Sequence, residues 1–295
     1  MTHLALPPIY CNFALMEYTL QVHGKLISLG KPQVMGILNC TPDSFYASSR
    51  VQNEEAIAQR ANQIITEGGT MIDIGAFSTR PGGVEVSEEE EMHRLRAALA
   101  IVRREQPDAV LSIDTFRPNV AKMAVEEFGA DIINDVSEGG ITGVVDTPLE
   151  QTADTYPAIF RMVAKLGVPY ILMSVKKTLP EMLTAFAREI QQLRDLGQKD
   201  IILDPGFGFG KTIEDNYAIL QHMNKLEVLG LPLLAGMSRK RMIFQLIDTD
   251  PNGSLNGTTV VNTLALLRGA KILRVHDVRQ AVEAVKITEA FAKQV

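Results

Sequence analysis

Short hydrophobic runs alternate with helical patterns along most of the chain, from Val34 onward. The runs are continuously apolar, which is typical of strands buried on both faces of a parallel sheet. Eight such runs occur, at residues 34–39, 71–75, 110–114, 132–134, 170–173, 201–204, 231–236 and 271–275. Eight parallel strands, each followed by a helix, predict an α/β protein with a single closed (β/α)8 barrel of the TIM type.

The segments between these runs carry the apolar spacing and the end signals of helices. Ser87 and the glutamates after it indicate a helix start, with carboxylates at the positive end of the helix dipole. Gly68 and Gly129 indicate helix ends. We predict helices at residues 53–68, from Ser87 onward, and at residues 119–128, 156–166, 181–196, 215–228, 258–268 and 278–292.

The residues before the repeat predict a β-hairpin. Residues 18–22 and 25–29 alternate apolar and polar positions on either side of His23-Gly24, which is a turn signal. Residues 1–16 contain Pro7-Pro8 and lack the basic start of a signal peptide, so we interpret them as a loose N-terminal arm. No composition break follows, and residues 17–295 are therefore predicted to form one barrel domain.

Composition excludes several classes of function. The 295 residues are 46% hydrophobic and carry a formal net charge of -6, so the sequence offers no basic field for nucleic acid. No apolar run is long enough to span a membrane. The two cysteines, Cys11 and Cys40, give neither a disulfide framework nor a metal-binding spacing. We expect a cytoplasmic protein without a nucleic-acid or membrane partner.

The positions where the predicted strands end are unusually polar. In (β/α)8 barrels the chemistry takes place at the carboxyl ends of the strands, so these positions belong together. A single carboxylate there is often only a helix cap, but polar side chains at most strand ends predict a binding site. The residues are Asn39, Ser78, Thr79, Arg80, Pro81, Asp114, Asn134, Asp135, Asp204, Ser238, Arg239, Lys240, Arg274, His276 and Asp277.

A glycine-rich loop at residues 204–212 follows the sixth run. Its end, Gly-Lys-Thr, suggests a phosphate-binding Walker loop, but that motif needs glycine where the chain has Pro205. The dinucleotide fingerprint also fails, because Gly206, Gly208 and Gly210 alternate without the required last spacing. What remains is a carboxylate, Asp204, beside a backbone that can approach a ligand closely. We interpret the loop as a contact for a flat heterocycle.

The strand-end residues divide into two kinds. Asp114, Asn134 and Asp204 supply acceptors and an amide, which suit the donor-rich edge of a 2-amino-4-oxo-pteridine. Arginine offers a planar fork for phosphate, as Arg80 and Arg274 could do beside His276. The Asn39 oxygen is a ligand that Mg²⁺ accepts when substrate phosphates supply the others. The sequence therefore predicts a site that holds a heterocycle on one side and a polyphosphate on the other.

These residues lie in blocks that resemble the dihydropteroate synthase family from Glu17 to the end of the chain. The blocks are residues 35–45, 72–82, 112–115, 133–136, 204–212, 236–240 and 274–277. The resemblance implies condensation of 6-hydroxymethyl-7,8-dihydropterin diphosphate with 4-aminobenzoate. The products would be 7,8-dihydropteroate and diphosphate, in folate biosynthesis, and the protein would be a sulfonamide target.

The resemblance also assigns roles. Asp114, Asn134, Asp204 and Lys240 would contact the pterin, with Met173 packed on its ring. Asn39, Arg274 and His276 would hold the Mg²⁺ diphosphate, with Asn39 as the metal ligand. Ser78, Thr79, Arg80 and Pro81 belong to a mobile loop that closes over the leaving group. Phe209, Ser238 and Lys240 would line the 4-aminobenzoate site, and the helix N-terminus after Lys240 would receive the carboxylate. The residues expected to act in catalysis are Arg80, Asp114, Asp204, Lys240, Arg274 and His276.

Three segments depart from the family's usual pattern. The residues Ser174 to Lys177 stand where the family commonly has His-Met and a glycine. Residues 48–50 read Ser-Ser-Arg, where Asp-Gly-Gly is usual. Glu138 interrupts the Ser-Gly-Gly that is common at its position. Two alternatives are a methyltetrahydrofolate-type methyltransferase and a pterin-binding protein without catalysis. The methyltransferase needs no diphosphate grip, which Arg80, Lys240, Arg274 and His276 supply.

Other residues have simpler interpretations. Lys211 is expected to bond loop carbonyls, and Cys40 to pack as a small apolar residue. Asp43, Asp73 and Asp135 are interpreted as structural carboxylates. The last two helices carry apolar faces that, with the resemblance, predict a homodimer; they include Val260, Leu264, Leu267, Val282, Val285 and Ile287.

Overall fold

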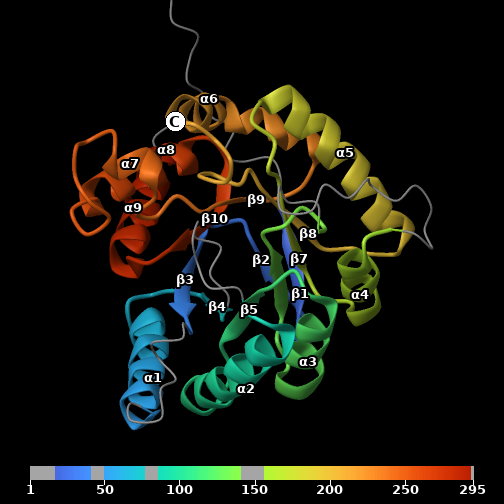
Figure 1. Ribbon diagram of the computed structural model, residues 1–295. Helices are drawn as coiled ribbons and strands as arrows, with labels where there is room; N and C mark the ends of the chain where they lie inside the picture. The colour runs from blue at the N-terminus through green and yellow to red at the C-terminus, as the bar shows by residue number, and fades with distance from the viewer. Residues whose placement is uncertain (1–16, 41–49, 77–85, 141–155, 294–295) are drawn as a thin grey trace, which may run out of the picture.

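The computed structural model describes residues 17–40, 50–76, 86–140 and 156–293, which form a closed barrel surrounded by helices (Figure 1). Each barrel strand pairs in parallel with its neighbours, in the order β10-β3-β4-β5-β6-β7-β8-β9. The strands are β3 (Gln33–Asn39), β4 (Met71–Gly75), β5 (Val110–Asp114), β6 (Ile132–Asp135), β7 (Tyr170–Met173), β8 (Ile201–Asp204), β9 (Leu233–Ala235) and β10 (Ala270–Val275). The predicted (β/α)8 barrel is confirmed.

Helices follow the strands as predicted, with two differences. The helices are α1 (Arg50–Thr66), α2 (Glu88–Glu105), α3 (Pro118–Phe128), α4 (Ala158–Leu166), α5 (Leu179–Asp195), α6 (Ile213–His222), α7 (Arg241–Phe244), α8 (Leu255–Leu267) and α9 (Val278–Ala292). The segment predicted as one helix at residues 215–228 is α6 followed by a 3-10 helix, η2 (Met223–Leu229). The short helix α7 was not among the helices predicted from apolar spacing, because one turn is too short to show periodicity. Only the resemblance implied a helix start after Lys240, and α7 begins there.

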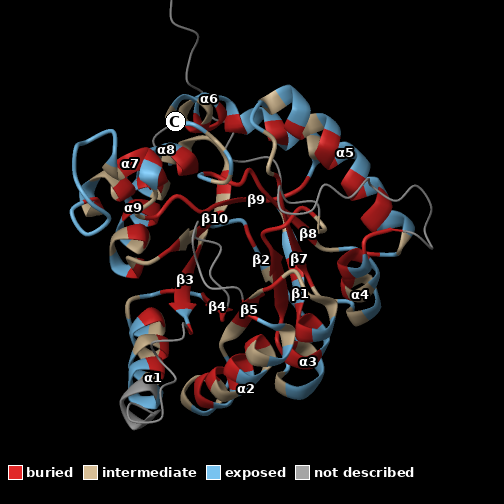
Figure 2. Cartoon of the chain, in the orientation of Figure 1, coloured by how far each residue is buried: buried red, intermediate tan, exposed pale blue. Residues whose placement is uncertain are grey.

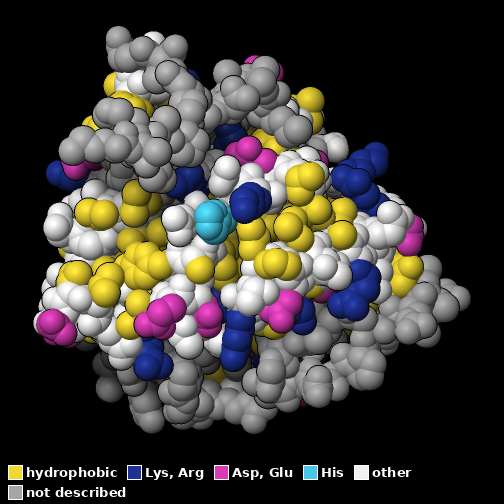
Figure 3. Space-filling view, turned by 90° about the horizontal axis from the view of Figure 1, so that it is seen from above, with side chains coloured by type: hydrophobic (Ala, Val, Ile, Leu, Met, Phe, Trp, Pro, Cys, Tyr) yellow, Lys and Arg dark blue, Asp and Glu magenta, His cyan; other side chains and the backbone are white. Residues whose placement is uncertain are grey.

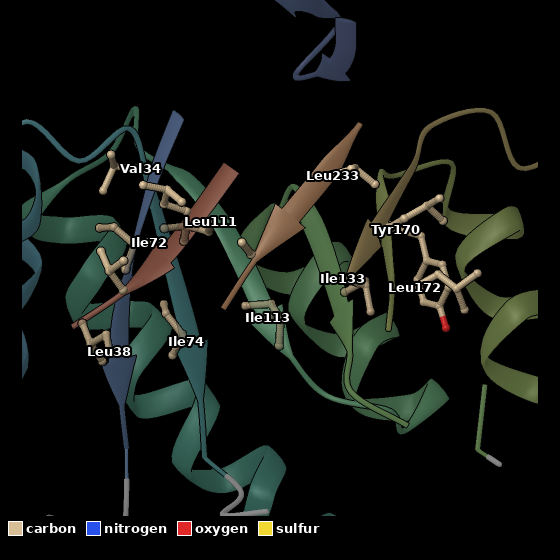
Figure 4. Packing of buried hydrophobic residues seen from close by; sticks show 14 of the residues in the cluster. Val34, Leu38, Ile72, Ile74, Leu111, Ile113, Ile133, Tyr170, Leu172 and Leu233 are labelled. Carbon is tan, nitrogen blue, oxygen red and sulfur yellow. The ribbon is translucent and has the colours of Figure 1, made fainter. Parts of the chain in front are cut away.

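The outward face of the strands is mostly apolar, with the buried carboxylate of Asp135 at the end of β6 as an exception that accepts from Tyr170 Oη. Side chains from successive strands lie in the layer between the sheet and the helices (Figure 4). They pack with buried helix residues such as Ile64 and Leu99, and in Figure 2 the strands and the inner sides of the helices are buried. The labelled strand residues are Val34, Leu38, Ile72, Ile74, Leu111, Ile113, Ile133, Tyr170, Leu172 and Leu233.

The inward face begins with a second apolar cluster, which the hairpin covers. Its strand members are Met35, Met71, Ile132, Ile171, Ile202, Leu234 and Ile272. Strands β1 (Thr19–Val22) and β2 (Lys25–Ser28) form the predicted antiparallel hairpin, and Leu20, Val22 and Leu29 belong to the same cluster. Since most of these strand residues lie near the start of their strands, the hairpin closes the amino end of the barrel.

The surface mixes charged and hydrophobic side chains. On the face seen from above in Figure 3, hydrophobic side chains reach the surface between Lys, Arg, Asp and Glu side chains. No helix formed by the described residues combines the length and the hydropathy needed to cross a membrane. The predicted arm, residues 1–16, lies outside the described residues.

Candidate active site

A polar layer lies above the apolar one inside the barrel. Side chains alternate between the two faces of a strand, so the residue two positions after an inward apolar residue also points inward. At these positions five of the eight barrel strands carry polar groups. They are Asp73 on β4, Ser112 and Asp114 on β5, Asn134 on β6, Asp204 on β8 and Arg274 on β10.

Arg274 joins two carboxylates at the centre of this layer. Its Nε donates to Asp73 at 2.6 Å and its Nη2 donates to Asp114 at 2.7 Å. Burial by itself lowers the pKa of Arg274, but Asp73 and Asp114 more than offset this and raise it. Arg274 is thus a permanent cation between two acids.

Burial and the neighbouring charges change the pKa of Asp114 in opposite directions. Burial raises the pKa of Asp114 to about 7, with Arg274 lowering it and Asp73 raising it further. Its side chain remains 19% exposed and can therefore meet a ligand. A carboxyl group that titrates near neutral pH can accept or share a proton with a bound heterocycle.

Asn134 has a buried oxygen that no described residue satisfies. Its Nδ2 donates to both oxygens of Asp73 at 3.3 Å, and Asp73 also accepts from Ser112 Oγ at 2.6 Å. Asn134 Oδ1 has no hydrogen-bond partner among the described residues. Because unsatisfied buried acceptors are rare, this oxygen is suited to a ligand N–H group.

Asp204 and the glycine loop form the next wall. Asp204 Oδ1 accepts from the Gly206 N–H at 2.8 Å. Gly206 has a φ of 66°, and a Cβ there would collide with the carbonyl oxygen of Ser174, so only glycine fits. Burial raises the pKa of Asp204, against the effect of Lys240 and the Gly206 N–H.

Lys240 reaches across the same loop. Its Nζ donates to the Phe207 carbonyl at 2.5 Å and lies 4.7 Å from the centre of the Phe209 ring. Burial lowers the pKa of Lys240 to about 8, although Asp204 acts to raise it. Lys240 also precedes α7, which is a single turn, so its own charge and not a helix dipole is the stronger attraction for an anion.

Ser238 and His276 follow the next two strands of the barrel, β9 and β10. Ser238 Oγ accepts from the His276 N–H at 3.1 Å and lies 3.1 Å from His276 Nδ1. Burial, with Arg274 nearby, lowers the pKa of His276 to about 4, so the ring is neutral at pH 7. If Ser238 donates to Nδ1, the proton of the neutral ring is on Nε2, where it can be donated to a ligand oxygen.

The whole constellation matches a known family. A family model described as pterin binding enzyme matches residues 35–276. The chain is 37% identical to the dihydropteroate synthase of Escherichia coli (strain K12), over 90% of this chain and 94% of that protein. It is 36% identical to the dihydropteroate synthase of Bacillus subtilis (strain 168), over 94% and 95%. The chain belongs to the dihydropteroate synthase family.

Solved structures of the family agree in fold. The Xanthomonas albilineans dihydropteroate synthase with 4-aminobenzoic acid matches with a TM-score of 0.81 and 35% identity, over 93% of this chain and 98% of that chain. The same enzyme in complex with 7,8-dihydropteroate matches with a TM-score of 0.79, 33% identity and the same coverage. This chain is therefore a pterin-binding transferase.

The structure brings together most of the residues predicted from the sequence. Nine of them lie near the carboxyl end of a barrel strand or in the loop that follows it. They are Asp114, Asn134, Met173, Asp204, Phe209, Ser238, Lys240, Arg274 and His276. Asn39 ends β3 and is exposed. Ser78, Thr79, Arg80 and Pro81 lie outside the described residues, as does Asp43.

Two predicted structural roles have different outcomes. Lys211 Nζ donates to the carbonyls of Ser174, Gly206 and Phe209, at 3.0, 2.9 and 3.3 Å, so its role of bonding loop carbonyls is confirmed. Asp73, interpreted as a structural carboxylate that holds loops, is completely buried and holds side chains of the polar layer, because it accepts from Arg274, Ser112 and Asn134. The signal was its spacing of two residues from Met71 on the inward face.

Proposed function

We propose that this member of the family condenses 6-hydroxymethyl-7,8-dihydropterin diphosphate with 4-aminobenzoate. The observation that carries the proposal is the set of Asp114, Asn134 and Asp204 at the ends of β5, β6 and β8, with Asn134 Oδ1 lacking a hydrogen-bond partner among the described residues. A 2-amino-4-oxo-pteridine presents N–H groups along one edge, which such a set of acceptors would bind. Relatives named for this activity, and the family structures with 4-aminobenzoic acid and 7,8-dihydropteroate, support it.

The acidic residues suit a reaction in which the pterin becomes cationic. If diphosphate leaves before the amine attacks, positive charge spreads over the pterin and its exocyclic methylene. Asp114 and Asp204 would stabilise that charge, and the neutral side chain of Asn134 would fix the ring between them. Because 4-aminobenzoate already carries a nucleophilic amine, the site needs to position it and does not need a strong base.

The leaving group would lie on the side of His276 and Arg274. Since Arg274 already donates to Asp73 and Asp114, it serves both to orient Asp114 and to offer positive charge to the diphosphate. His276, neutral at pH 7, can donate a hydrogen bond without adding charge. Arg80, outside the described residues, remains the second proposed arginine at this end.

Magnesium is the proposed metal, and the described residues fit one mode of binding it. Among them no group of three or more His, Cys, Asp or Glu side chains could form a protein-only metal site. The exposed Asn39 oxygen suits an ion held mainly by substrate phosphates and water. Bound Mg²⁺ would neutralise charge on the departing diphosphate.

Phe209, Ser238 and Lys240 are the proposed contacts of 4-aminobenzoate. The Phe209 ring offers an apolar surface for the aryl ring, and Lys240 Nζ lies 4.7 Å from the centre of the Phe209 ring. With a pKa lowered to about 8, Lys240 is still mostly charged at pH 7 and can pair with the carboxylate. Sulfonamides resemble this substrate, so we also propose the site as a sulfonamide target.

We further propose a homodimer through α8 and α9. Val260 and Leu264 on α8 are 51% and 43% exposed, and Ile287 and Phe291 on α9 are 68% and 61% exposed. The two helices contact each other, so these side chains extend one surface. Val285 is buried and belongs to the barrel core instead.

We also propose a location in the cytoplasm. The buried free thiol of Cys40 fits a reducing compartment.

The proposed function is tested by product formation. Purified protein is incubated with pterin diphosphate, 4-aminobenzoate and Mg²⁺, and 7,8-dihydropteroate is measured by liquid chromatography. We expect product from the wild type and a loss of at least a hundredfold in kcat/KM for Arg274→Ala, about 3 kcal/mol, because two buried acids lose their cation. Pterin binding without product would favour the non-catalytic alternative, and methyl transfer to a cobamide protein would favour the methyltransferase.

A further inference from the structure

Glu138 stands in an unusual position in the turn after β6. Its φ is 54°, in the left-handed region that favours glycine, and its side chain is completely buried. Ser174 Oγ donates to Glu138 Oε1 at 3.0 Å, and Lys176 Nζ forms an ion pair with Oε2 at 3.4 Å. Burying a carboxylate on strained backbone destabilises the fold, and such strain concentrates at functional sites.

The contacts of Glu138 lead directly to the proposed pterin site. Ser174 follows Met173, and its N–H donates to the Asp204 carbonyl at 2.9 Å. Its own carbonyl accepts from Lys211, which also holds the carbonyls of Gly206 and Phe209. Glu138 thus restrains Ser174, a residue that connects the end of β7 to the end of β8 and its glycine loop.

The residues in contact come from two separate loops. In the sequence, Glu138 and the segment from Ser174 to Lys177 lie more than thirty positions apart. The structure brings them together, since Ser174 donates to Glu138 and Lys176 forms an ion pair with it. Each loop therefore supplies the partner that the other needs.

We infer that Glu138, acting through Ser174 and Lys176, is a positioning residue for the pterin. It fixes the backbone at Met173 and Ser174, and through Lys211 the loop that carries Phe209, so that Asp204 and Met173 meet the ring in one arrangement. This inference rests on the proposed function, because it takes the set of strand-end residues as the pterin site.

A purely structural role for Glu138 makes a different prediction. Replacing it with glycine relieves the positive φ and removes a buried charge, but it also removes the contacts with Ser174 and Lys176. If Glu138 only supported the fold, Glu138→Gly would change thermal stability and leave pterin affinity alone. If Glu138 positions the pterin, Glu138→Gly lowers the affinity for the pterin even at a temperature where all of the protein is folded.

The experiment compares four variants with the wild type at a temperature where all are folded. Calorimetry measures the Kd for 6-hydroxymethyl-7,8-dihydropterin, and thermal unfolding is recorded separately. We expect Glu138→Gly to raise the Kd roughly tenfold, which corresponds to about 1.4 kcal/mol. Ser174→Ala should act in the same direction, and Glu138→Gln, which keeps an acceptor for Ser174, should recover much of the affinity. Asp248→Gly is the control, since Asp248 has a φ of 50° but is exposed and lies in the loop after α7.

An unchanged Kd in Glu138→Gly or in Ser174→Ala would overturn the inference, whatever happens to the melting temperature. If Glu138→Gly did not fold, the Kd of Ser174→Ala would decide. Wild-type protein that binds the pterin but forms no dihydropteroate would contradict the proposed function and leave this comparison valid. Wild-type protein that does not bind the pterin would contradict both.

Discussion

Asp204 lies at the end of β8 with one carboxylate oxygen bonded to the Gly206 N–H. The other oxygen is an acceptor available to the pterin. We expect Asp204→Asn to weaken pterin binding by about 1 to 3 kcal/mol, because an amide N–H₂ would face a ligand donor. Calorimetry with 6-hydroxymethyl-7,8-dihydropterin measures this loss, and titration with pyrophosphate should show little change.

The matched control for Asp204 is Asp200→Asn, at the residue that directly precedes the same strand, β8. Asp200 accepts from the Gln21 N–H at 3.0 Å, so it ties the hairpin to the barrel and is remote from the site. Its substitution should leave pterin affinity unchanged. Equal pterin affinity in Asp204→Asn and the wild type would remove Asp204 from the pocket.

Glu189 on α5 predicts a pH dependence of stability. Burial, with Glu138 close by, raises the pKa of Glu189 to about 8, and neither carboxylate oxygen has a hydrogen-bond partner among the described residues. An unfolded glutamate has a pKa of about 4.3. Between these values the native state holds a proton that the unfolded state has released, so the free energy of unfolding falls as pH rises.

We therefore expect Glu189→Gln to flatten this fall between about pH 5 and 8, by up to about 1.4 kcal/mol per pH unit. Urea unfolding at several pH values measures the slope. Glu126→Gln, on the exposed side of α3, is the control and should keep the wild-type slope. Parallel curves for the wild type and Glu189→Gln would show that Glu189 is ionised in the native protein throughout this range.

Single residues also show what the sequence could not predict. Asp114, Asn134 and Asp204 were predictable because they end hydrophobic runs, and strand ends meet at one face of a barrel. The contacts of Asp73 with Arg274 and Asn134 were not predicted, because Asp73 lies inside a run, where only the alternation of faces reveals its direction. The contact between Glu138 and Ser174 depends on side-chain positions in two loops, and no local pattern encodes it.

At the scale of elements, the hairpin acts as a cover for the barrel. Leu29 is fully buried against the inward apolar cluster, together with Leu20 and Val22. We expect Leu29→Ala to lower the free energy of unfolding by about 2 to 5 kcal/mol, because it leaves a cavity at the amino end. Pterin affinity should not change, since the polar layer lies at the other end. Chemical denaturation and calorimetry on the same variant test both parts.

The control for Leu29 is Leu26→Ala in the same hairpin, where the leucine is 73% exposed. That substitution should change stability by less than about 0.5 kcal/mol. A small effect of Leu29→Ala, equal to that of Leu26→Ala, would show that the hairpin does not seal the barrel.

Elements were largely predictable from sequence, and the exceptions have physical reasons. Continuous apolar runs identified all eight barrel strands, because strands buried on both faces need apolar side chains throughout. The seventh strand was predicted too long. In the structure β9 is only Leu233–Ala235, since Pro232 has no N–H for the ladder and Gly236 weakens a strand. The change from α6 to η2 left no mark in the apolar spacing.

At the scale of the whole molecule, the exposed apolar residues of α8 and α9 predict assembly. We expect the wild type to sediment as a dimer at micromolar concentration. The double variant Leu264→Glu, Ile287→Glu should sediment as a monomer, because each subunit would have to bury two added carboxylates in the interface. Leu26→Glu, at an exposed apolar residue of the hairpin, should remain a dimer. A wild type that stays monomeric would contradict the proposed assembly.

The central claim is that the barrel mouth promotes loss of diphosphate from a bound pterin and transfer of that pterin to an arylamine. Single-turnover release of pyrophosphate, followed with excess enzyme in the presence and absence of 4-aminobenzoate, tests it most directly. We predict that pterin diphosphate and Mg²⁺ give one pyrophosphate per bound pterin, and that with 4-aminobenzoate each pyrophosphate is matched by one 7,8-dihydropteroate. Enzyme that binds pterin diphosphate but releases no pyrophosphate, with or without 4-aminobenzoate, would contradict the account.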